Sequence, residues 1–231
     1  MLSADSVWDR DYAEPHLIIS ERLYNLTIGA VLLWGFLVNA LMVKMIDPVM
    51  IMEAIPNPIV FYVGYLICSV AGIMIYTKSD NPWVSFLGYN MLVVPIGLVL
   101  VLVLSMYLGT AEGQNLVLRA MSMTGMVTAG MMFLGGAFPD FFLSLGRILF
   151  MALIFGLLAV FGMRFFSPAS YQPGMFDGLF VVIFSGYIGY DWARANAIPK
   201  TFDNAVDSAA SLYLDIINLF LYILRMMSSR D

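Results

Sequence analysis

The sequence predicts an all-α polytopic membrane protein with seven transmembrane helices. Of its 231 residues, 61% are hydrophobic and 12% are charged, whereas soluble domains have about 45–50% apolar and about 25% charged residues. Such a composition contains too few polar residues to cover a water-facing surface, so lipid must be the main solvent. A helix of about 20 residues crosses ~30 Å of hydrocarbon. The chain therefore has room for seven spans with short connections.

A polar, acidic tail is expected over residues 1–22, ahead of a single membrane domain over residues 23–231. Its acids are Asp5, Asp9, Asp11, Glu14 and Glu21. The tail lacks the basic region, apolar core and cleavage site of a signal peptide, so the first apolar stretch should remain as a helix. A solvated extension is one interpretation of the tail, and a handle for a partner protein is the other.

The first three spans are expected in the charge-free stretches 23–43, 54–77 and 81–111. Pro48, Pro56 and Pro58 interrupt the first connection, which we interpret as a loop. The second connection is tight, and Trp83 follows it as an interfacial ring.

Spans four and five are expected over residues 114–138 and from Pro139-Asp140 to 163. Arg119 lies near the start of the fourth, and Arg147 and Arg164 lie near the two ends of the fifth. Terminal arginines usually extend to the lipid headgroups. Arg119 or Arg147 could instead turn inward to meet an acid.

The last two spans are expected over residues 174–196 and 205–224, joined by a short loop. Asp215 interrupts the apolar run of the last span, so a hydropathy window could miss that helix. Polar residues nevertheless recur there at steps of four and three, along one helical face: Asn204, Ser208, Ser211, Asp215, Asn218, Tyr222 and Arg225. In hydrocarbon such a stripe must face other helices or water, so we expect it to line a path through the protein.

Asp191 and Asp215 are the candidate functional residues. They are equidistant in sequence from Asp203, so an antiparallel hairpin would place both about 9–14 Å from the loop at 1.5 Å per residue. Two carboxylates in a poorly solvated site cannot both ionise cheaply, and the pair titrates as a unit. The alternative is that each acid pairs separately with an arginine, for example Asp191 with Arg194, and only stabilises the bundle.

The C-terminal residues resemble a known family. Gly189-Tyr190-Asp191, followed by the run from Leu212-Tyr213-Leu214-Asp215 to Phe220, is similar to the signature of the Bax inhibitor-1 (TMBIM) family. The resemblance implies a bacterial member with seven helices, in which the last is central and wrapped by the other six. It also implies a pH-sensitive calcium leak controlled by the aspartate pair. Some members carry an arginine on the second helix, where this chain has none; Arg119, Arg147 or Arg194 could replace it.

The leading functional hypothesis is passive Ca²⁺ permeation, in which protons act on Asp191 and Asp215 and the polar stripe forms the path. Carboxylate, amide and hydroxyl oxygens suit this hard cation, and the two aspartates could bind it weakly. No cofactor and no enzymatic activity are expected.

Two other classes of function are alternatives. Intramembrane aspartyl proteases also use two helix-borne aspartates, but Tyr213-Leu214-Asp215 lacks their Gly-x-Gly-Asp arrangement. An interaction protein that modulates a membrane-bound protease or a stress response is the second alternative, since the resemblance implies such partners. Nucleic-acid binding is excluded because no basic patch is present.

The expected location is a bacterial plasma membrane. The distribution of Lys and Arg favours a cytoplasmic N-terminus by a narrow margin, and seven spans would place the C-terminus on the opposite face.

Overall fold

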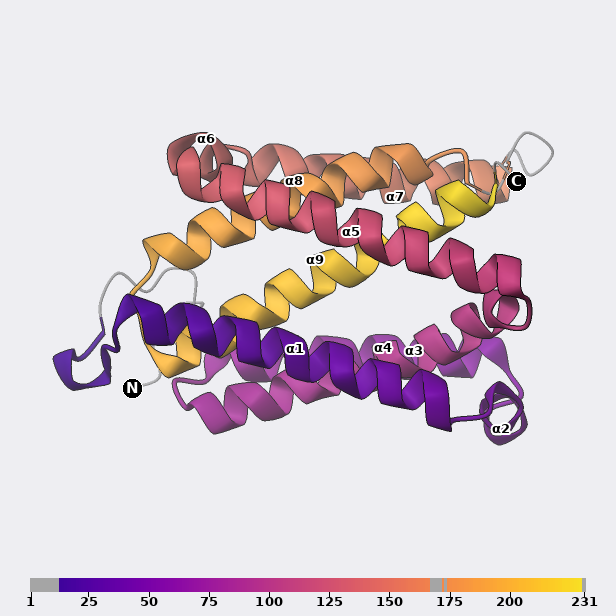
Figure 1. Cartoon of the computed structure of the whole chain (residues 1–231), viewed down its shortest axis with the longest axis horizontal. Helices are drawn as coiled ribbons and strands as arrows, with labels where there is room; N and C mark the ends of the chain where they lie inside the picture. The colour runs from indigo at the N-terminus through magenta and orange to yellow at the C-terminus, as the bar shows by residue number, and fades with distance from the viewer. Residues whose placement is uncertain (1–12, 167–171, 173, 230–231) are drawn as a thin grey trace. The chain divides into compact units, whose positions relative to one another are not determined.

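The structure is a computed structural model, which describes residues 13–166, 172 and 174–229. Every regular element in these ranges is helical (Figure 1), which confirms the all-α class. Within these residues, a short 3-10 helix at Pro15–Leu17 precedes nine α-helices. The α-helices are α1 (Glu21–Met45), α2 (Pro48–Ala54), α3 (Pro58–Lys78), α4 (Pro82–Leu108), α5 (Ala111–Ala137), α6 (Pro139–Ser144), α7 (Gly146–Phe166), α8 (Asp177–Ala197) and α9 (Phe202–Ser228).

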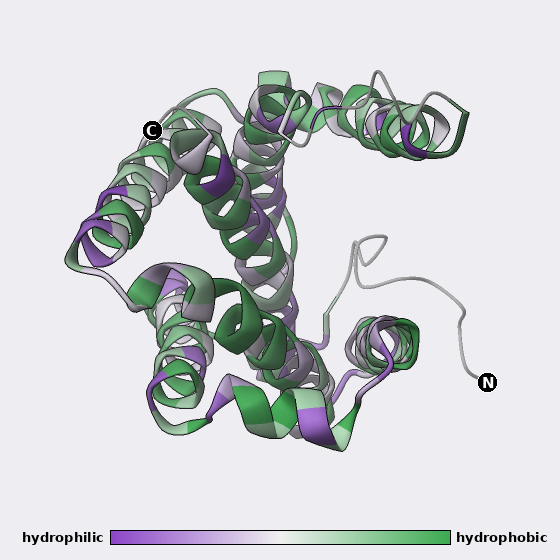
Figure 2. Cartoon of the chain, turned by 90° about the vertical axis from the view of Figure 1, so that its right-hand side faces the viewer, coloured by the Kyte–Doolittle hydropathy of each residue, from purple (hydrophilic) through white to green (hydrophobic). Residues whose placement is uncertain are grey.

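Six of these helices are long and apolar enough to cross a membrane: α1, α3, α4, α5, α7 and α9. Hydrophobic residues dominate the long helices in Figure 2. The protein is therefore a multi-pass membrane protein. The sequence predicts that a hydropathy window could miss the last span. This prediction was wrong, because α9 is apolar enough to be recognised as a membrane span, whereas α8 is not. Asp177, Asp191 and Arg194, together with several small or polar residues, lower the hydropathy of α8.

Two connections differ from the sequence prediction. The segment between the first two long helices is not a simple loop, because Pro48 begins the seven-residue helix α2. The predicted fifth span is broken near Leu145 into the short α6 and the long α7. Proline is tolerated in the first turn of a helix, where its missing N–H has no intrahelical partner. Both short helices thus begin at prolines, Pro48 and Pro139, for which the sequence predicts a loop or a turn.

Three helices begin with the same device, an Asp or Asn directly followed by proline. The side chains of Asp47, Asn57 and Asn81 each accept a hydrogen bond from the backbone N–H two residues later, at 2.9 Å. The side-chain oxygen satisfies one of the free N–H groups of the first turn, and proline presets the backbone angle. These pairs define the starts of α2, α3 and α4.

The described residues up to Gly109, from residue 13 on, form one compact group of helices together with Ala197–Ser211. Here α3 and α4 pack with almost no space at Gly72 and Gly88, since a Cβ at Gly72 would lie 2.6 Å from the Gly88 carbonyl oxygen. Helix α1 packs on α4 and is joined to it by polar contacts. The Tyr89 hydroxyl donates to the Val31 carbonyl at 3.0 Å, and the Asn39 amide donates to the Val93 carbonyl at 2.9 Å.

The first ten residues of α9 belong to this group, and all of them except Phe202 and Ser211 are buried. The Tyr24 and Ser208 hydroxyls share a hydrogen bond of 3.0 Å, and the Ser85 hydroxyl donates to the Asp203 carboxylate at 2.7 Å. The backbone N–H of Ile19 donates to the Lys200 carbonyl at 2.8 Å, which joins the N-terminal segment to the α8–α9 connection. These contacts bring the starts of α1, α4 and α9 together.

The second compact group contains α5 to α8 and the rest of α9, from Leu212. Helix α8 packs closely against its neighbours in this group at two of its glycines, Gly186 and Gly189. A Cβ at Gly135 of α5 would collide with the backbone of Gly189, and a Cβ at Gly189 would collide with the Phe142 ring of α6. A Cβ at Gly186 would lie 2.7 Å from the Leu149 side chain of α7. Small residues permit such close approach of helices in membranes.

Candidate functional site

Asp191 and Asp215 meet inside the second group of helices. Asp191 lies on α8 and Asp215 lies on α9, and their carboxyl groups are hydrogen-bond partners. Only 8% of Asp191 and 7% of Asp215 is exposed. A hydrogen bond between two carboxyl groups requires that one of them carry the proton. The hairpin therefore holds a site where a single proton can be shared.

Two further side chains of α8 lie close to the pair. Tyr187 lies one turn before Asp191 and is close enough to interact electrostatically with both carboxyls. Arg194 lies one turn after Asp191, acts on its charge, and has its guanidinium 5.6 Å from the centre of the Tyr190 ring. Sequence reasoning identified Arg194 but missed Tyr187, although the i−4 spacing from Asp191 would have placed both on one face.

The three candidate arginines lie in different environments. Arg194 is half-buried near the pair, whereas Arg119 on α5 and Arg147 on α7 are both exposed. Exposed arginines near helix ends can reach the headgroup region. Of the three, the structure therefore brings only Arg194 to the aspartates.

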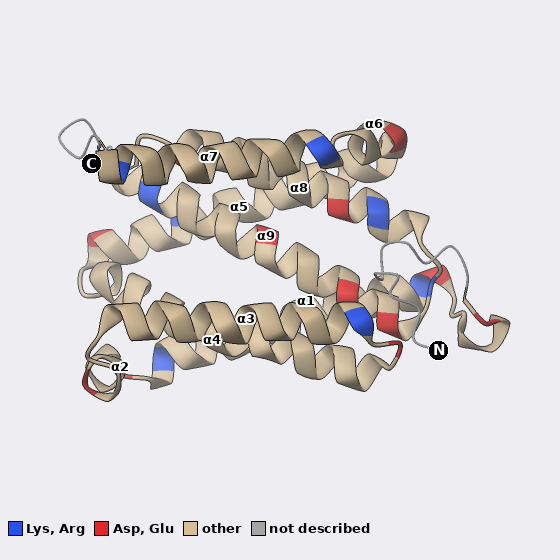
Figure 3. Ribbon diagram, turned by 180° about the vertical axis from the view of Figure 1, so that it is seen from behind, with Lys and Arg blue, Asp and Glu red and all other residues tan. Residues whose placement is uncertain are grey.

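The predicted polar stripe runs along α9, whose acidic residues are visible within the helix in Figure 3. In the first group, Asn204 and Ser208 are buried, and Ser211 is half-buried. In the second group, the Asn218 amide donates to the Leu214 carbonyl of its own helix at 2.8 Å. Tyr222 stacks on Phe180, with ring centres 4.7 Å apart. The stripe is thus largely enclosed by protein, and Tyr222 is held in an aromatic stack.

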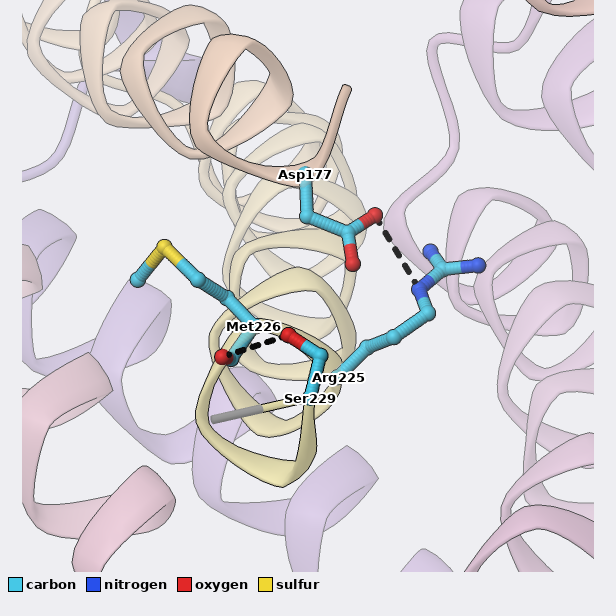
Figure 4. A network of polar contacts seen from close by, with 4 residues as sticks. All are labelled: Asp177, Arg225, Met226 and Ser229. Atoms are coloured by element: carbon cyan, nitrogen blue, oxygen red, sulfur yellow. Dashed lines mark hydrogen bonds and ion pairs between the residues drawn. The ribbon is translucent and has the colours of Figure 1, made fainter. Parts of the chain in front are cut away.

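A second charged contact joins α8 and α9, and sequence reasoning missed it. Asp177, in the first turn of α8, is 3.2 Å from the Nε of Arg225, in the last turn of α9 (Figure 4). The Arg225 guanidinium also lies 4.7 Å from the centre of the Tyr222 ring. The antiparallel hairpin explains this contact, since the start of one helix meets the end of the other. The same hairpin symmetry that placed the aspartate pair could have predicted it.

Metal ligands do not converge at this site. Within the described residues, no three His, Cys, Asp or Glu side chains are placed to hold a metal ion. Any cation that interacts with the carboxyl pair must take most of its ligands from backbone oxygens, amides, hydroxyls or water.

The fold and site define a multi-pass helical membrane protein with a buried carboxyl pair on its last two long helices. Residues 17–231 match the family described as "Inhibitor of apoptosis-promoting Bax1". The chain therefore belongs to the Bax inhibitor-1 family, which confirms the resemblance found in its C-terminal residues.

Individual relatives match over shorter stretches. The chain is 38% identical over 91 residues to a BI1-like protein of Arabidopsis thaliana, which covers 39% of this chain and 35% of that protein. It is 32% identical over 138 residues to an uncharacterized protein of Helicobacter pylori strain J99, with 58% of each chain covered. Protein LIFEGUARD 4 of Arabidopsis thaliana is 42% identical over 90 residues, 38% of this chain and 35% of its own length. The matches thus span about a third to just over half of these relatives.

Proposed function

We propose that the protein is a passive, pH-sensitive calcium leak in which the proton shared by Asp191 and Asp215 controls permeation. The observation that carries the proposal is the buried hydrogen bond between these two carboxyls, one on each of the last two long helices. Removing the shared proton leaves two neighbouring negative charges in a poorly hydrated site, which is strongly unfavourable. The helices must then separate, or admit water or a cation between the carboxylates.

The proposal includes α8 as the seventh membrane span and α9 as the central helix. Helix α8 has 21 residues, enough for ~30 Å at 1.5 Å per residue. Its close packing on α5 through Gly135 and Gly189 supports a place within the bundle. The charged residues that lower its hydropathy would be tolerated because Asp177 and Asp191 are buried by protein rather than exposed to lipid.

The polar stripe of α9 supplies the proposed path. Calcium prefers oxygen ligands, and the stripe provides carboxylate, amide and hydroxyl oxygens from Asn204 to Asn218. Weak, sequential sites favour passage over tight retention. A change in the Asp191–Asp215 contact would shift α9 and alter access to these oxygens. We place the protein in the plasma membrane of a bacterium, since relatives from Helicobacter support a bacterial setting.

The test is Ca²⁺ entry into dye-loaded liposomes that contain the purified protein, measured from about pH 5 to about pH 8. The double variant Asp191→Asn, Asp215→Asn keeps the side-chain shapes but cannot exchange a proton. We expect a pH-dependent flux in the parent and a flattened pH profile in the variant. Asp140→Asn is the matched control, because Asp140 is exposed on α6, and should retain the parent profile. Absence of flux above empty liposomes at every pH would refute the leak and favour the partner-binding alternative.

A further inference from the structure

Helices α8 and α9 contact each other at three successive levels of their hairpin, all within the second group of helices. Asp191 and Asp215 meet at the level nearest the connection. Asp177 and Arg225 form the ion pair near the open end (Figure 4). Between these two polar levels the contact is aromatic, and Tyr222 is its member from α9. An apolar level therefore separates the carboxyl pair from the open end of the hairpin.

The aromatic level is a stack of three rings. The centre of the Tyr222 ring lies 4.7 Å from that of Phe180 and 5.7 Å from that of Phe184, at interplanar angles of 15° and 19°. Phe180 and Phe184, one turn apart on α8, are both buried. Gly156 of α7 lies behind the Phe180 ring, since a Cβ there would be only 3.1 Å from Phe180 Cζ. Phe180 is thus supported from behind, and the half-buried Tyr222 is the ring with more room to move.

This stack interrupts the polar stripe of α9. Tyr222 lies seven residues after Asp215, about 10 Å of helical rise. Between them the stripe contains Asn218, whose amide donates to the Leu214 carbonyl of its own helix. A hydrated cation that has passed the carboxyl pair would therefore meet ring surface before it reaches the open end. Apolar constrictions stop ions because they exclude the water that an ion needs.

Tyr222 is connected to the polar levels on both sides of it. Toward the open end, the Arg225 guanidinium lies 4.7 Å from the centre of the Tyr222 ring and is 3.2 Å, at its Nε, from Asp177. Toward the connection, the ring centres of Phe184 and Tyr187 are 6.3 Å apart. Tyr187 in turn lies close to both carboxyls of the pair. Packed side chains therefore link the carboxyl pair to the stack.

We propose that the stack of Tyr222 on Phe180 and Phe184 is the closed gate of the leak, and that Tyr187 transmits changes at the carboxyl pair to it. The inference rests on the proposed function and identifies how its path is closed. Opening requires that the Tyr222 ring turn away from the two phenylalanines, a side-chain rotation that leaves the backbone of α9 in place. Repulsion between the two carboxylates would displace the Tyr187 ring, and with it the neighbouring Phe184.

The test is Ca²⁺ entry into dye-loaded liposomes between about pH 5 and about pH 8, for equal amounts of folded protein. Tyr222→Ala removes the stacked ring, so we expect about tenfold more flux at the pH where the parent conducts least, because the closed state loses both ring contacts. Tyr222→Phe keeps the stack and should conduct like the parent. Phe165→Ala is the matched control, because Phe161 and Phe165 also stack, with ring centres 6.2 Å apart, but both are exposed on α7. This control should leave the flux unchanged.

A separate variant tests the link to the carboxyl pair. Tyr187→Leu keeps an apolar side chain but loses the ring between the pair and Phe184. We expect the ratio between the highest and the lowest flux across the pH range to fall toward one. A purely structural role of Tyr187 would reduce the amount of folded protein and leave this ratio unchanged, which would overturn the link.

The gate and the leak fail in different ways. A pH-dependent parent beside an unchanged Tyr222→Ala, or a Tyr222→Phe that conducts like Tyr222→Ala, would overturn the gate and leave the leak standing. A silent parent beside a conducting Tyr222→Ala would support the gate and refute a leak in the parent. No flux in either protein would overturn both. If Tyr222→Ala does not fold, Tyr222→Leu takes its place, because it keeps apolar volume without a flat ring; unchanged flux in that variant would equally overturn the gate.

Discussion

Replacing Arg225 with methionine should destabilise the α8–α9 hairpin by about 2 kcal/mol. Asp177 has only 5% of its side chain exposed, and Arg225 supplies its ion pair at 3.2 Å. A hydrogen bond to a charged group contributes about 1.5–3 kcal/mol. Because 51% of the Arg225 side chain is exposed, solvent screening favours the lower limit, about 1.5 kcal/mol. The contact with the Tyr222 ring adds about 0.5 kcal/mol.

The assay is the free energy of unfolding in mixed detergent micelles, titrated with a denaturing detergent. Arg225→Met leaves a buried carboxylate without its partner, whereas Asp177→Asn removes the buried charge and should cost less. The double variant should therefore be more stable than the sum of the two single losses predicts, by about 1 kcal/mol. Arg119→Met, at an exposed arginine of α5, is the matched control. The reasoning is refuted if Arg225→Met is no less stable than this control.

Three further effects follow from other contacts. Gly135→Val should lower the melting temperature sharply, because any Cβ at this position meets the Gly189 backbone. On the same helix, a Cβ at Gly130 meets nothing within 4 Å, so Gly130→Val should change the melting temperature little. Equal melting temperatures of the two variants would contradict this packing. Asn81→Ala should cost about 1 kcal/mol of unfolding free energy by removing the cap of α4, and a loss below a few tenths would contradict the capping role. Burial lowers the pKa of the Lys200 ammonium, while Glu21 acts in the opposite direction. Just below the ordinary lysine pKa, the unfolded chain therefore binds more protons than the folded chain, and the free energy of unfolding should rise with pH in that window. Lys200→Met should abolish this rise in alkaline unfolding titrations. An unchanged slope in the variant would contradict the role of Lys200.

The positions of the long helices could be predicted because lipid imposes a simple rule of length and hydrophobicity. The predicted stretch 23–43 lies within α1, and the stretch 114–138 nearly coincides with α5. The short helices α2 and α6 could not be found this way, because six or seven residues carry no usable periodicity. The proline of α2 resembles a loop signal until the capping Asp47 before it is considered, whereas α6 follows Phe138, which makes no side-chain cap.

Spacing within one hairpin predicted the meeting of Asp191 and Asp215, because an antiparallel pair with a short loop constrains depth. Asp177 and Arg225 obey the same constraint nearer the open end of the hairpin, where their contact was missed. Asp203 and Asp207 were missed as buried groups for a different reason. Their burial depends on α1 and α4, through contacts such as those of Tyr24 and Ser85, and long-range packing of this kind is not encoded in local periodicity.

The central claim is that the Asp191–Asp215 pair changes its proton content over the pH range in which calcium flux changes. Infrared difference spectroscopy of the protein in lipid, between about pH 5 and about pH 8, detects the protonated carboxyl directly through its C=O stretch. We predict a carboxylic acid band that disappears over the range in which flux changes and is absent from the double variant Asp191→Asn, Asp215→Asn. A band that is the same in parent and double variant, or that stays constant while flux changes, would contradict it.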